Sequence, residues 1–307
     1  MQTGAVILAA EPASDAAHFK PLWNIGSISV AKRVVATLRQ AGIEKIVMVT
    51  GYHAAALERH LANLGIIFLR NQDFAGSRLM DSIGIGLQYL SDKCDQVILA
   101  QVDAPFFIAS TVRSLMNAGF DLACPVYQGH CGHPMLIGTT LIGQLLAEQD
   151  ASDLRSAAER LSVPVREVPV DDPGILMDLA STEDINAFLQ DHNRQLTRPQ
   201  ISVALAREVT FFDEKIAMLL ELIDETSSVR TACQRMQISY STGWNIIRIL
   251  ESQLACSLVI RSQGGTNGGQ SVLTEYGKQL LEQYRGFREE LQKNVDNLYK
   301  KYFGDVF

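Results

Sequence analysis

The amino-acid sequence predicts an α/β fold: a three-layer, Rossmann-like domain with a mostly parallel sheet, followed by a smaller domain built mainly from helices. The length of 307 residues suggests about two domains. Over residues 1–193, short apolar runs alternate with amphipathic segments, which is typical of parallel strands covered on both faces by helices. A polar segment at 194–201 begins the stretch 194–205, which we interpret as a linker. It leads into residues 206–307, where helical patterns dominate.

The first domain is built from strands that alternate with helices. Near-continuous apolar runs predict strands at residues 5–10, 45–50, 66–69 and 96–100. Apolar residues at helical spacing predict helices at residues 30–41, 54–64 and 79–90. Ligands of such sheets bind beyond the carboxyl ends of the strands, so we expect the functional residues of this domain there.

Composition and charge limit the classes of function. The formal net charge of −7 excludes a chain that is basic throughout, although it allows one local basic face. No window holds 18 uninterrupted apolar residues, so we expect no membrane span. The chain has five cysteines in scattered positions and no CxxC pair, which indicates reduced thiols in a cytoplasmic protein and no disulfide framework.

The second domain has the layout of a winged helix-turn-helix. Helices are predicted at residues 214–225, 229–236, 242–254 and 274–302, with Thr274 as the N-cap of the last. Strands at 258–261 and 271–273 flank the glycine-rich turn GGTNGGQ. In such domains the second helix of the motif enters the major groove of DNA. Candidate DNA-binding residues come from the turn, that helix and the wing: Ser239, Tyr240, Ser241, Thr242, Asn245, Arg248, Arg261, Thr266 and Asn267. The same pattern also allows a protein–protein or dimerisation module.

One stretch of the second domain carries a family resemblance. ISYSTGWNIIRILE, followed by LVIRSQGGTNGGQSVLTEYGKQLLEQY, resembles the DNA-binding domain of the ModE-type, molybdate-responsive regulators, which belong to the LysR-like winged helices. The resemblance covers about residues 208–290. It implies a homodimer in which the first and last helices pack against their symmetry mates. The molybdate-binding domain that follows in that family is not expected here, because the chain ends soon after the long helix.

The segment after the first predicted strand carries a second resemblance. LAAEPASDAAHFK at residues 8–20 is similar to LAAG-x-S-x-R-M-G-x-x-K, the signature of the MobA-like nucleotidyltransferases. This resemblance covers about residues 4–190 and implies a nucleotidyltransferase fold. Leu8, Ala9, Ala10 and Lys20 match the signature. Four positions depart from it, at the first glycine, the serine, the arginine and the second glycine: Glu11, Ala13, Asp15 and Ala17.

Two of these departures place carboxylates where a triphosphate would lie. At an effective dielectric constant near 20, two unit charges ~4 Å apart interact by roughly 4 kcal/mol. Because Asp15 stands at the position of an arginine, an attraction of this size becomes a repulsion. Glu11 adds a side chain where a glycine lets the backbone approach phosphate. The sequence therefore predicts that ordinary triphosphate binding is weakened.

The resemblance also implies the remaining site residues. Lys20 and Asp103 would be the catalytic residues, with Asp103 and Asp178 holding Mg²⁺. Ligand-binding roles fall on Ala9, Ala10, Lys20, Asn71, Ser82, His133 and Asp178. Ala180 stands where the family has a second acid. Other interpretations stay open: Asp103 could cap the next helix, Lys20 could be a surface residue, and His130, Cys131 and His133 could form a zinc site.

Together, these observations predict a cytoplasmic, dimeric transcription regulator linked to molybdenum-cofactor metabolism. Its sensor would be a degenerate MobA-like domain that binds a nucleotide or a molybdopterin-type ligand, with Mg²⁺ as a possible cofactor. One alternative is an active, Mg²⁺-dependent enzyme that transfers a cytidyl or guanylyl group from CTP or GTP to molybdopterin and also regulates its own operon. A second alternative is an interaction scaffold that uses both domains for assembly.

Overall fold

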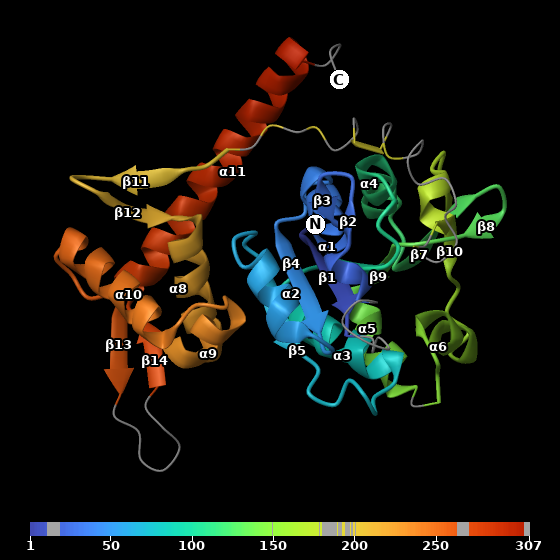
Figure 1. The fold of residues 1–307 in the computed structure, drawn as a ribbon, viewed down its shortest axis with the longest axis horizontal. Coiled ribbons are helices and arrows are strands. Elements are labelled where there is room, and N and C mark those ends of the chain that lie inside the picture. The colour runs from blue at the N-terminus through green and yellow to red at the C-terminus, as the bar shows by residue number, and fades with distance from the viewer. Residues whose placement is uncertain are drawn as a thin grey trace. The chain divides into compact units, whose positions relative to one another are not determined.

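The computed structural model of the chain describes residues 1–10, 19–148, 150–177, 201–262 and 270–303, together with residues 179, 189, 192, 193, 197 and 199. The chain divides into two compact units (Figure 1). The first consists of Met1–Leu61 and Ile66–Thr197, and the second consists mainly of Arg198–Phe307. Each unit has its own buried core and is described by itself.

The first unit is built around an eight-stranded mixed sheet in the order β10-β7-β9-β6-β1-β4-β5, with β8 paired to β7. The strands are β1 (Thr3–Ala9), β4 (Lys45–Thr50), β5 (Ile67–Arg70), β6 (Gln96–Gln101), β7 (Leu122–Tyr127), β8 (His130–Cys131), β9 (Met135–Gly138) and β10 (Arg166–Pro169). Neighbouring strands from β6 to β5 run parallel, as do β7 and β10. The strand β9 runs antiparallel to β6 and β7.

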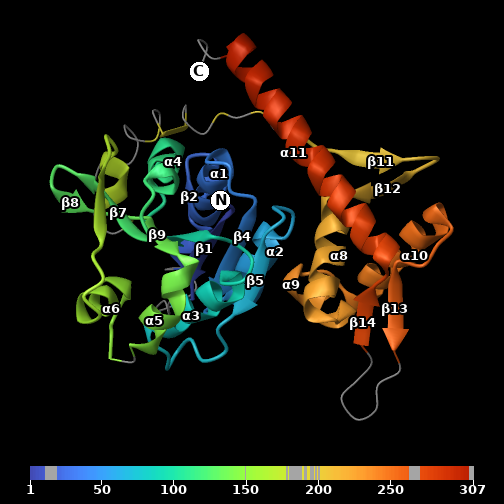
Figure 2. The same cartoon turned by 180° about the vertical axis from the view of Figure 1, so that it is seen from behind.

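The sheet is the middle layer of three, as the sequence predicts. The central strand β1 is buried from Gly4 to Ala9, which explains its continuous apolar run. Helices α1 (Val30–Gln40) and α4 (Ala109–Asn117) lie on one side of the sheet, and α3 (Leu79–Leu90) and α5 (Thr139–Ala147) lie on the other (Figures 1 and 2). Two shorter helices, α2 (Ala54–Leu61) and α6 (Leu154–Arg160), complete the unit with the hairpin β2 (Asn24–Ile25) and β3 (Ile28–Ser29) and the 3₁₀ turns η2 (Lys20–Leu22) and η3 (Pro173–Leu176).

A buried arginine joins α1 to the end of the first unit. Arg33 is fully buried and donates to Nδ1 of His192 at 2.9 Å, Oδ1 of Asn193 at 2.8 Å and the carbonyl of Ile25 at 2.8 Å. His192 in turn lies 3.2 Å from the carbonyl of Phe107 through Nε2. Burial lowers the pKa of His192 to about 4, so its ring is neutral near pH 7. These contacts hold His192 and Asn193, which follow the last strand of the sheet, against α1.

The second unit confirms the winged helix-turn-helix layout and adds one element. Its helices are α8 (Glu214–Thr226), α9 (Val229–Arg235), α10 (Tyr240–Leu254) and α11 (Glu275–Phe303), and its wing strands are β13 (Val259–Ser262) and β14 (Gln270–Leu273). The Thr274 hydroxyl accepts a hydrogen bond from the Gly277 N–H at 3.1 Å, as an N-cap does. An antiparallel hairpin, β11 (Ala204–Ala206) and β12 (Thr210–Asp213), was not expected, and its first strand begins inside the predicted linker.

Close packing of α9 against α10 fixes the helix-turn-helix. Gly243 of α10 faces Cys233 of α9 so closely that a Cβ atom at position 243 would clash with its sulfur. Ala232 of α9 is also fully buried. The Ser239 side chain caps α10 by accepting from the Thr242 N–H at 3.0 Å, so α10 begins at Tyr240, two residues earlier than predicted.

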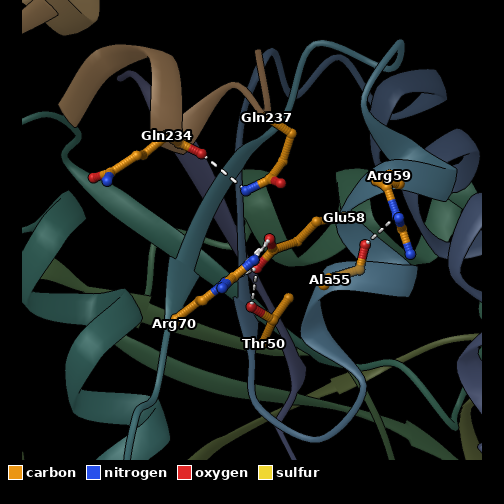
Figure 3. A network of polar contacts seen from close by, with 7 residues as sticks. All are labelled: Thr50, Ala55, Glu58, Arg59, Arg70, Gln234 and Gln237. Atoms are coloured by element: carbon orange, nitrogen blue, oxygen red, sulfur yellow. Dashed lines mark hydrogen bonds and ion pairs between the residues drawn. The ribbon is translucent and has the colours of Figure 1, made fainter. Parts of the chain in front are cut away.

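A buried carboxylate links three elements of the first unit. Glu58 of α2 is fully buried and accepts from the Thr50 hydroxyl at 2.7 Å and from Nε of Arg70 at 2.8 Å (Figure 3). The Arg70 guanidinium forms a second contact with Glu58 at 2.5 Å and is 43% exposed at its side chain. Glu58 therefore fixes the carboxyl ends of β4 and β5 relative to α2.

We predict that Arg70→Ala destabilises the first unit by about 2–4 kcal/mol, because it leaves a buried carboxylate without its cation. Arg59→Ala is the matched control, since Arg59 lies on the same helix as Glu58 and its Nε donates to the Ala55 carbonyl one turn away at 3.0 Å (Figure 3). Urea unfolding measures the free energy of unfolding of both variants. Equal losses in the two variants would contradict the role assigned to Glu58.

Candidate functional site

The carboxyl ends of four parallel strands meet at one edge of the sheet. In the pairing register, Ala9 of β1 lies opposite Thr50 of β4, and Thr50 lies opposite Arg70 of β5. On the other side, Leu8 lies opposite Gln101 of β6. The residues that leave these strands are therefore neighbours. They include Ala10 and Asn71, which were predicted to bind the ligand, and Asp103, which was predicted to be catalytic and to hold Mg²⁺.

Asn71 organises the loop between β5 and α3. It is buried, and its Nδ2 donates to the Ser77 hydroxyl at 2.7 Å and to the Ser82 hydroxyl at 2.9 Å. Its Oδ1 accepts from the Asp73 N–H at 3.0 Å. The structure thus brings Asn71 and Ser82 together, as the resemblance implies, and it uses the amide hydrogens of Asn71 within the loop.

Asp103 lies two residues beyond β6 and is partly exposed. Its backbone carbonyl accepts from the Leu179 N–H at 3.2 Å, so Leu179 lies at this strand end. Lys20, at the start of η2, is also partly exposed. Ala9 and Ala10 are buried and contribute backbone only.

Asp172 is a residue of this site that the sequence did not single out. It is buried and accepts from the Ile108 N–H at 3.0 Å, the Thr111 hydroxyl at 2.6 Å and the Gly174 N–H at 3.0 Å. Burial raises its pKa, and the hydrogen bonds oppose that shift. Asp172 therefore ties η3 to the segment that follows Asp103. Two adjacent aspartates in the sequence DDPG give no signal for such a long-range contact.

His133 lies in the GHP motif, preceding a cis peptide bond to Pro134. Its N–H donates to the Ile175 carbonyl at 3.0 Å. Burial lowers the pKa of its ring below the usual value, while the negative charge of Asp103 raises that pKa and the positive charge of Arg155 lowers it. His133 is thus a neutral imidazole near pH 7 that senses the charge of Asp103.

Several predicted residues lie outside the described residues. These are the four departures in the signature segment, the second predicted metal ligand and two wing residues: Glu11, Ala13, Asp15, Ala17, Asp178, Thr266 and Asn267. Within the described part of the chain, no cluster of three histidine, cysteine or acidic side chains suits a metal ion. Cys131 is joined to Cys124 by a disulfide, so the structure contradicts both a Cys131 zinc ligand and the expectation that these two thiols are free.

Six of the predicted DNA-binding residues are exposed on α10 or at its N-cap: Ser239, Tyr240, Ser241, Thr242, Asn245 and Arg248. Ser239 caps the helix, and its hydroxyl lies 2.8 Å from that of Ser241 and 2.7 Å from that of Thr242. One turn further, the Arg248 guanidinium donates to Oδ1 of Asn245 at 2.8 Å. Both members of this pair are exposed, and so is Tyr240, at 46%. The helix therefore presents hydroxyl, amide and guanidinium groups together.

Two arginines stack on aromatic rings beside this surface. The Arg261 guanidinium of β13 lies 3.3 Å from the ring centroid of Trp244, and that of Arg230 in α9 lies 5.1 Å from the ring centroid of Tyr240. Stacking on a ring restricts a guanidinium while leaving its N–H groups available. Trp244 and Arg230 were not among the predicted site residues. In the sequence, only the presence of arginines near the helix-turn-helix motif pointed to these two residues.

Two family models match the chain. One, described as a MobA-like NTP transferase domain, matches residues 5–165, just over half of the chain. The other, described as a bacterial regulatory helix-turn-helix protein of the lysR family, matches residues 217–278. Both resemblances found in the sequence are confirmed.

Curated relatives match a part of the chain. The molybdenum transport protein ModE of Azotobacter vinelandii is 34% identical over 80 residues, which cover 26% of this chain and 30% of that protein. The DNA-binding transcriptional dual regulator ModE of Escherichia coli K12 is 33% identical over 88 residues, covering 29% and 34%. The chain thus spans about a third of the length of these relatives.

Solved structures agree with the fold of the first unit. A nucleotidyl transferase from Methanothermobacter superposes with a TM-score of 0.52 and 21% identity, covering 64% of this chain and 98% of that one. The Mycobacterium tuberculosis protein Rv0371c gives a TM-score of 0.50 and 23% identity, covering 62% and 98%. Both likenesses concern the fold alone. In the part of the chain that the structure describes, no helix is long and apolar enough to cross a membrane.

We predict that the His133 ring titrates below pH 6.5 and that its neighbours shift this titration in opposite directions. Asp103→Asn removes a negative charge and lowers the pKa of His133 further, whereas Arg155→Gln removes a positive charge and raises it. NMR titration of the ring nitrogens measures the pKa of His133 in the unmodified protein and in the two variants. A rise of this pKa in Asp103→Asn would show that Asp103 does not face His133.

Proposed function

The chain belongs to the MobA-like NTP transferase domain family over residues 5–165, and from this premise we propose that it is a DNA-binding transcription regulator whose sensor is this domain. The observation that carries the proposal is the exposed surface of α10. Its capped N-terminus, the Asn245–Arg248 pair and the stacked Arg261 lie on the recognition helix and the wing strand of a lysR-type motif. The regulator would work in the cytoplasm.

These groups suit the two kinds of contact that DNA offers. Hydroxyls at a helix N-terminus and arginines bind phosphate oxygens, which position a protein on the duplex. Asparagine and arginine side chains also read base edges in the major groove. Because the net charge of the chain is −7, phosphate attraction must come from this local face, and binding should be sensitive to salt.

The proposed link to molybdenum metabolism rests on the ModE relatives. The Azotobacter vinelandii relative carries the name molybdenum transport protein, and the second unit of this chain matches the lysR-type helix-turn-helix model over residues 217–278. The first unit supplies a fold of the MobA-like type, so both units point to the same metabolism. We therefore propose a nucleotide or a molybdopterin-type compound as the sensed ligand.

The residues for such a ligand lie at the strand ends of the first unit. Asp103 offers a partly exposed carboxylate and Lys20 a cation, while Asn71 and Ser82 order the neighbouring loop. A single carboxylate fits Mg²⁺ in the common case where phosphates and water supply most of its ligands. In the bound state, Mg²⁺ would neutralise phosphate charge beside Asp103, with Asp178 as the second proposed ligand. Glu11 and Asp15 in the signature segment are the reason that we propose a sensor and not an enzyme.

We also propose that the regulator is a homodimer joined through α11. The buried residues of this helix, Gly277, Leu281 and Tyr284, all lie in its first ten positions. Beyond them an apolar row continues at helical spacing through Phe287, Leu291, Val295, Leu298 and Tyr302. Phe287, Leu298 and Tyr302 are at least half exposed. Such a partly exposed apolar row suits an isologous contact with a second copy.

We predict that Arg248→Ala weakens binding to a random-sequence DNA duplex and lowers the slope of log affinity against log salt concentration by about 1, because one phosphate contact is lost. Fluorescence anisotropy over a series of salt concentrations measures both quantities. Lys293→Ala, which removes an exposed cation from α11, is the matched control and should leave the slope unchanged. Equal effects in the two variants would refute the assignment of α10 as the DNA-contacting helix.

We predict that Leu298→Asp converts the dimer into monomers, because it places a charge in the apolar row of α11. Asn297→Asp introduces the same charge at the next position, outside that row, and should remain dimeric. Sedimentation velocity of the full chain measures the oligomeric state. A dimeric Leu298→Asp variant would rule out this face of α11 as the interface.

A further inference from the structure

A disulfide stands beside the GHP motif and has no part in the function proposed above. It joins Cys124 of β7 to Cys131 of β8, seven residues apart, with 6.0 Å between the two Cα atoms. The strands pair antiparallel, with Val126 opposite Cys131. Cys124 is fully buried in the sheet, whereas Cys131 is partly exposed. The two sulfurs therefore differ in their access to a reagent from solvent.

A cavity opens next to the accessible sulfur. Its volume is about 430 Å³, and Cys131 lines it together with α6 and the chain that leads into β10. Arg155, Glu159 and Glu167 are the charged residues of its lining. A volume of this size lies in the range of small-molecule sites, roughly 300–1,000 Å³. It admits a compound of the size of a small peptide.

We propose that the Cys124–Cys131 bond is a thiol–disulfide exchange site for a low-molecular-weight thiol that enters through this cavity. The thiolate of that compound attacks Sγ of Cys131, forms a mixed disulfide with it and releases Cys124 as the leaving thiolate, which takes up a proton. A second thiol then attacks the sulfur of the bound compound and releases Cys131. Together, the two steps consume two thiols, reduce the protein by two electrons and yield one external disulfide. Oxidation by that external disulfide follows the same steps in reverse.

Burial and charge set the direction of attack. Cys124 has no exposed surface, so an external thiolate reaches the bond from the Cys131 side. Arg155 is exposed in the cavity wall, and its positive charge attracts the incoming thiolate and the carboxylates of a peptide thiol. The negative charges of Glu159 and Glu167 oppose this attraction. The leaving group remains inside the sheet, where its recapture by Cys131 competes with the second step.

Exchange at Cys131 would act on the neighbouring ligand site. Strand β8 leads directly into Gly132 and His133, whose N–H groups donate to the Pro125 carbonyl at 2.9 Å and the Ile175 carbonyl at 3.0 Å. Gly132 packs so closely on Ile175 that a Cβ atom at position 132 would clash with its carbonyl. Opening the disulfide removes the covalent link that holds β8 to β7 beside these contacts. The redox state would therefore change how firmly His133 is placed.

The test uses reduced full-length protein with Cys94→Ser and Cys256→Ser, which removes the two partly exposed free cysteines and keeps the buried Cys233. Cys124→Ser and Cys131→Ser are added separately, and each variant is treated with glutathione disulfide. Intact mass and peptide mapping identify the product. The proposal predicts one glutathione on Cys131 in the Cys124→Ser variant and none on Cys124 in the Cys131→Ser variant. Equal labelling of Cys124 and Cys131 would overturn it.

A second measurement avoids substitutions at the bond. Protein with Cys124 and Cys131 intact is equilibrated in a series of glutathione redox buffers, and its free thiols are then alkylated. The free thiols of Cys124 and Cys131 should disappear together as the buffer becomes more oxidising, while that of Cys233 remains. Arg155→Glu should slow mixed-disulfide formation severalfold, and Arg160→Glu, on the same helix but outside the cavity lining, should not. Free Cys124 and Cys131 thiols in every oxidising buffer would refute the exchange site.

Discussion

The alignment of parallel strand ends around β1 is the constraint on which the first unit depends. β1 is buried on both faces and pairs with β4 and β6 in parallel, so the chain leaves all three strands at one edge. Every backbone group of a buried strand needs a partner, and the paired neighbours on both sides supply them. The same arrangement brings Ala10, Asn71 and Asp103 together from distant parts of the sequence. A change that shifts one of these strands would therefore disturb the fold and the site at once.

Buried polar contacts stabilise this edge from several directions. Glu58 holds the ends of β4 and β5, Asp172 holds the segment after Asp103, and Arg33 with His192 holds the end of the unit to α1. Each is a charged or polar group removed from water, and each has hydrogen-bond partners that offset the cost of its burial. The segments they hold surround the proposed ligand site. A ligand bound there would contact segments whose positions these hydrogen bonds already fix.

The sequence predicted the secondary structure well where periodicity is strong. Apolar spacing predicted the strands β1, β4, β5 and β6, the helices α1 to α3, the helices of the second unit and the wing, and the side chain of Thr274 predicted the N-cap. The strands β7 to β10 and the helices α4 to α6 were not predicted. The hairpin of β11 and β12 was missed because Ala204–Ala206 is short and overlaps the predicted linker. Glu58, Arg33 and Asp172 were missed because a buried charge is recognised by its distant partners, which local patterns do not reveal. The Cys124–Cys131 pairing was missed because it depends on the register of β7 and β8.

The central claim of this account is that ligand binding in the first unit and DNA binding in the second are energetically coupled. Coupling of this kind is reciprocal, so it can be measured from the ligand side. Calorimetry of the full chain with CTP, GTP and molybdopterin, each with Mg²⁺ and each in the presence and absence of a DNA duplex, tests it most directly. The account predicts that one of these compounds binds and that DNA changes its affinity by about fivefold or more. A compound that binds through Asp103 with the same affinity in the presence and absence of DNA, or the absence of binding by all three, would contradict it.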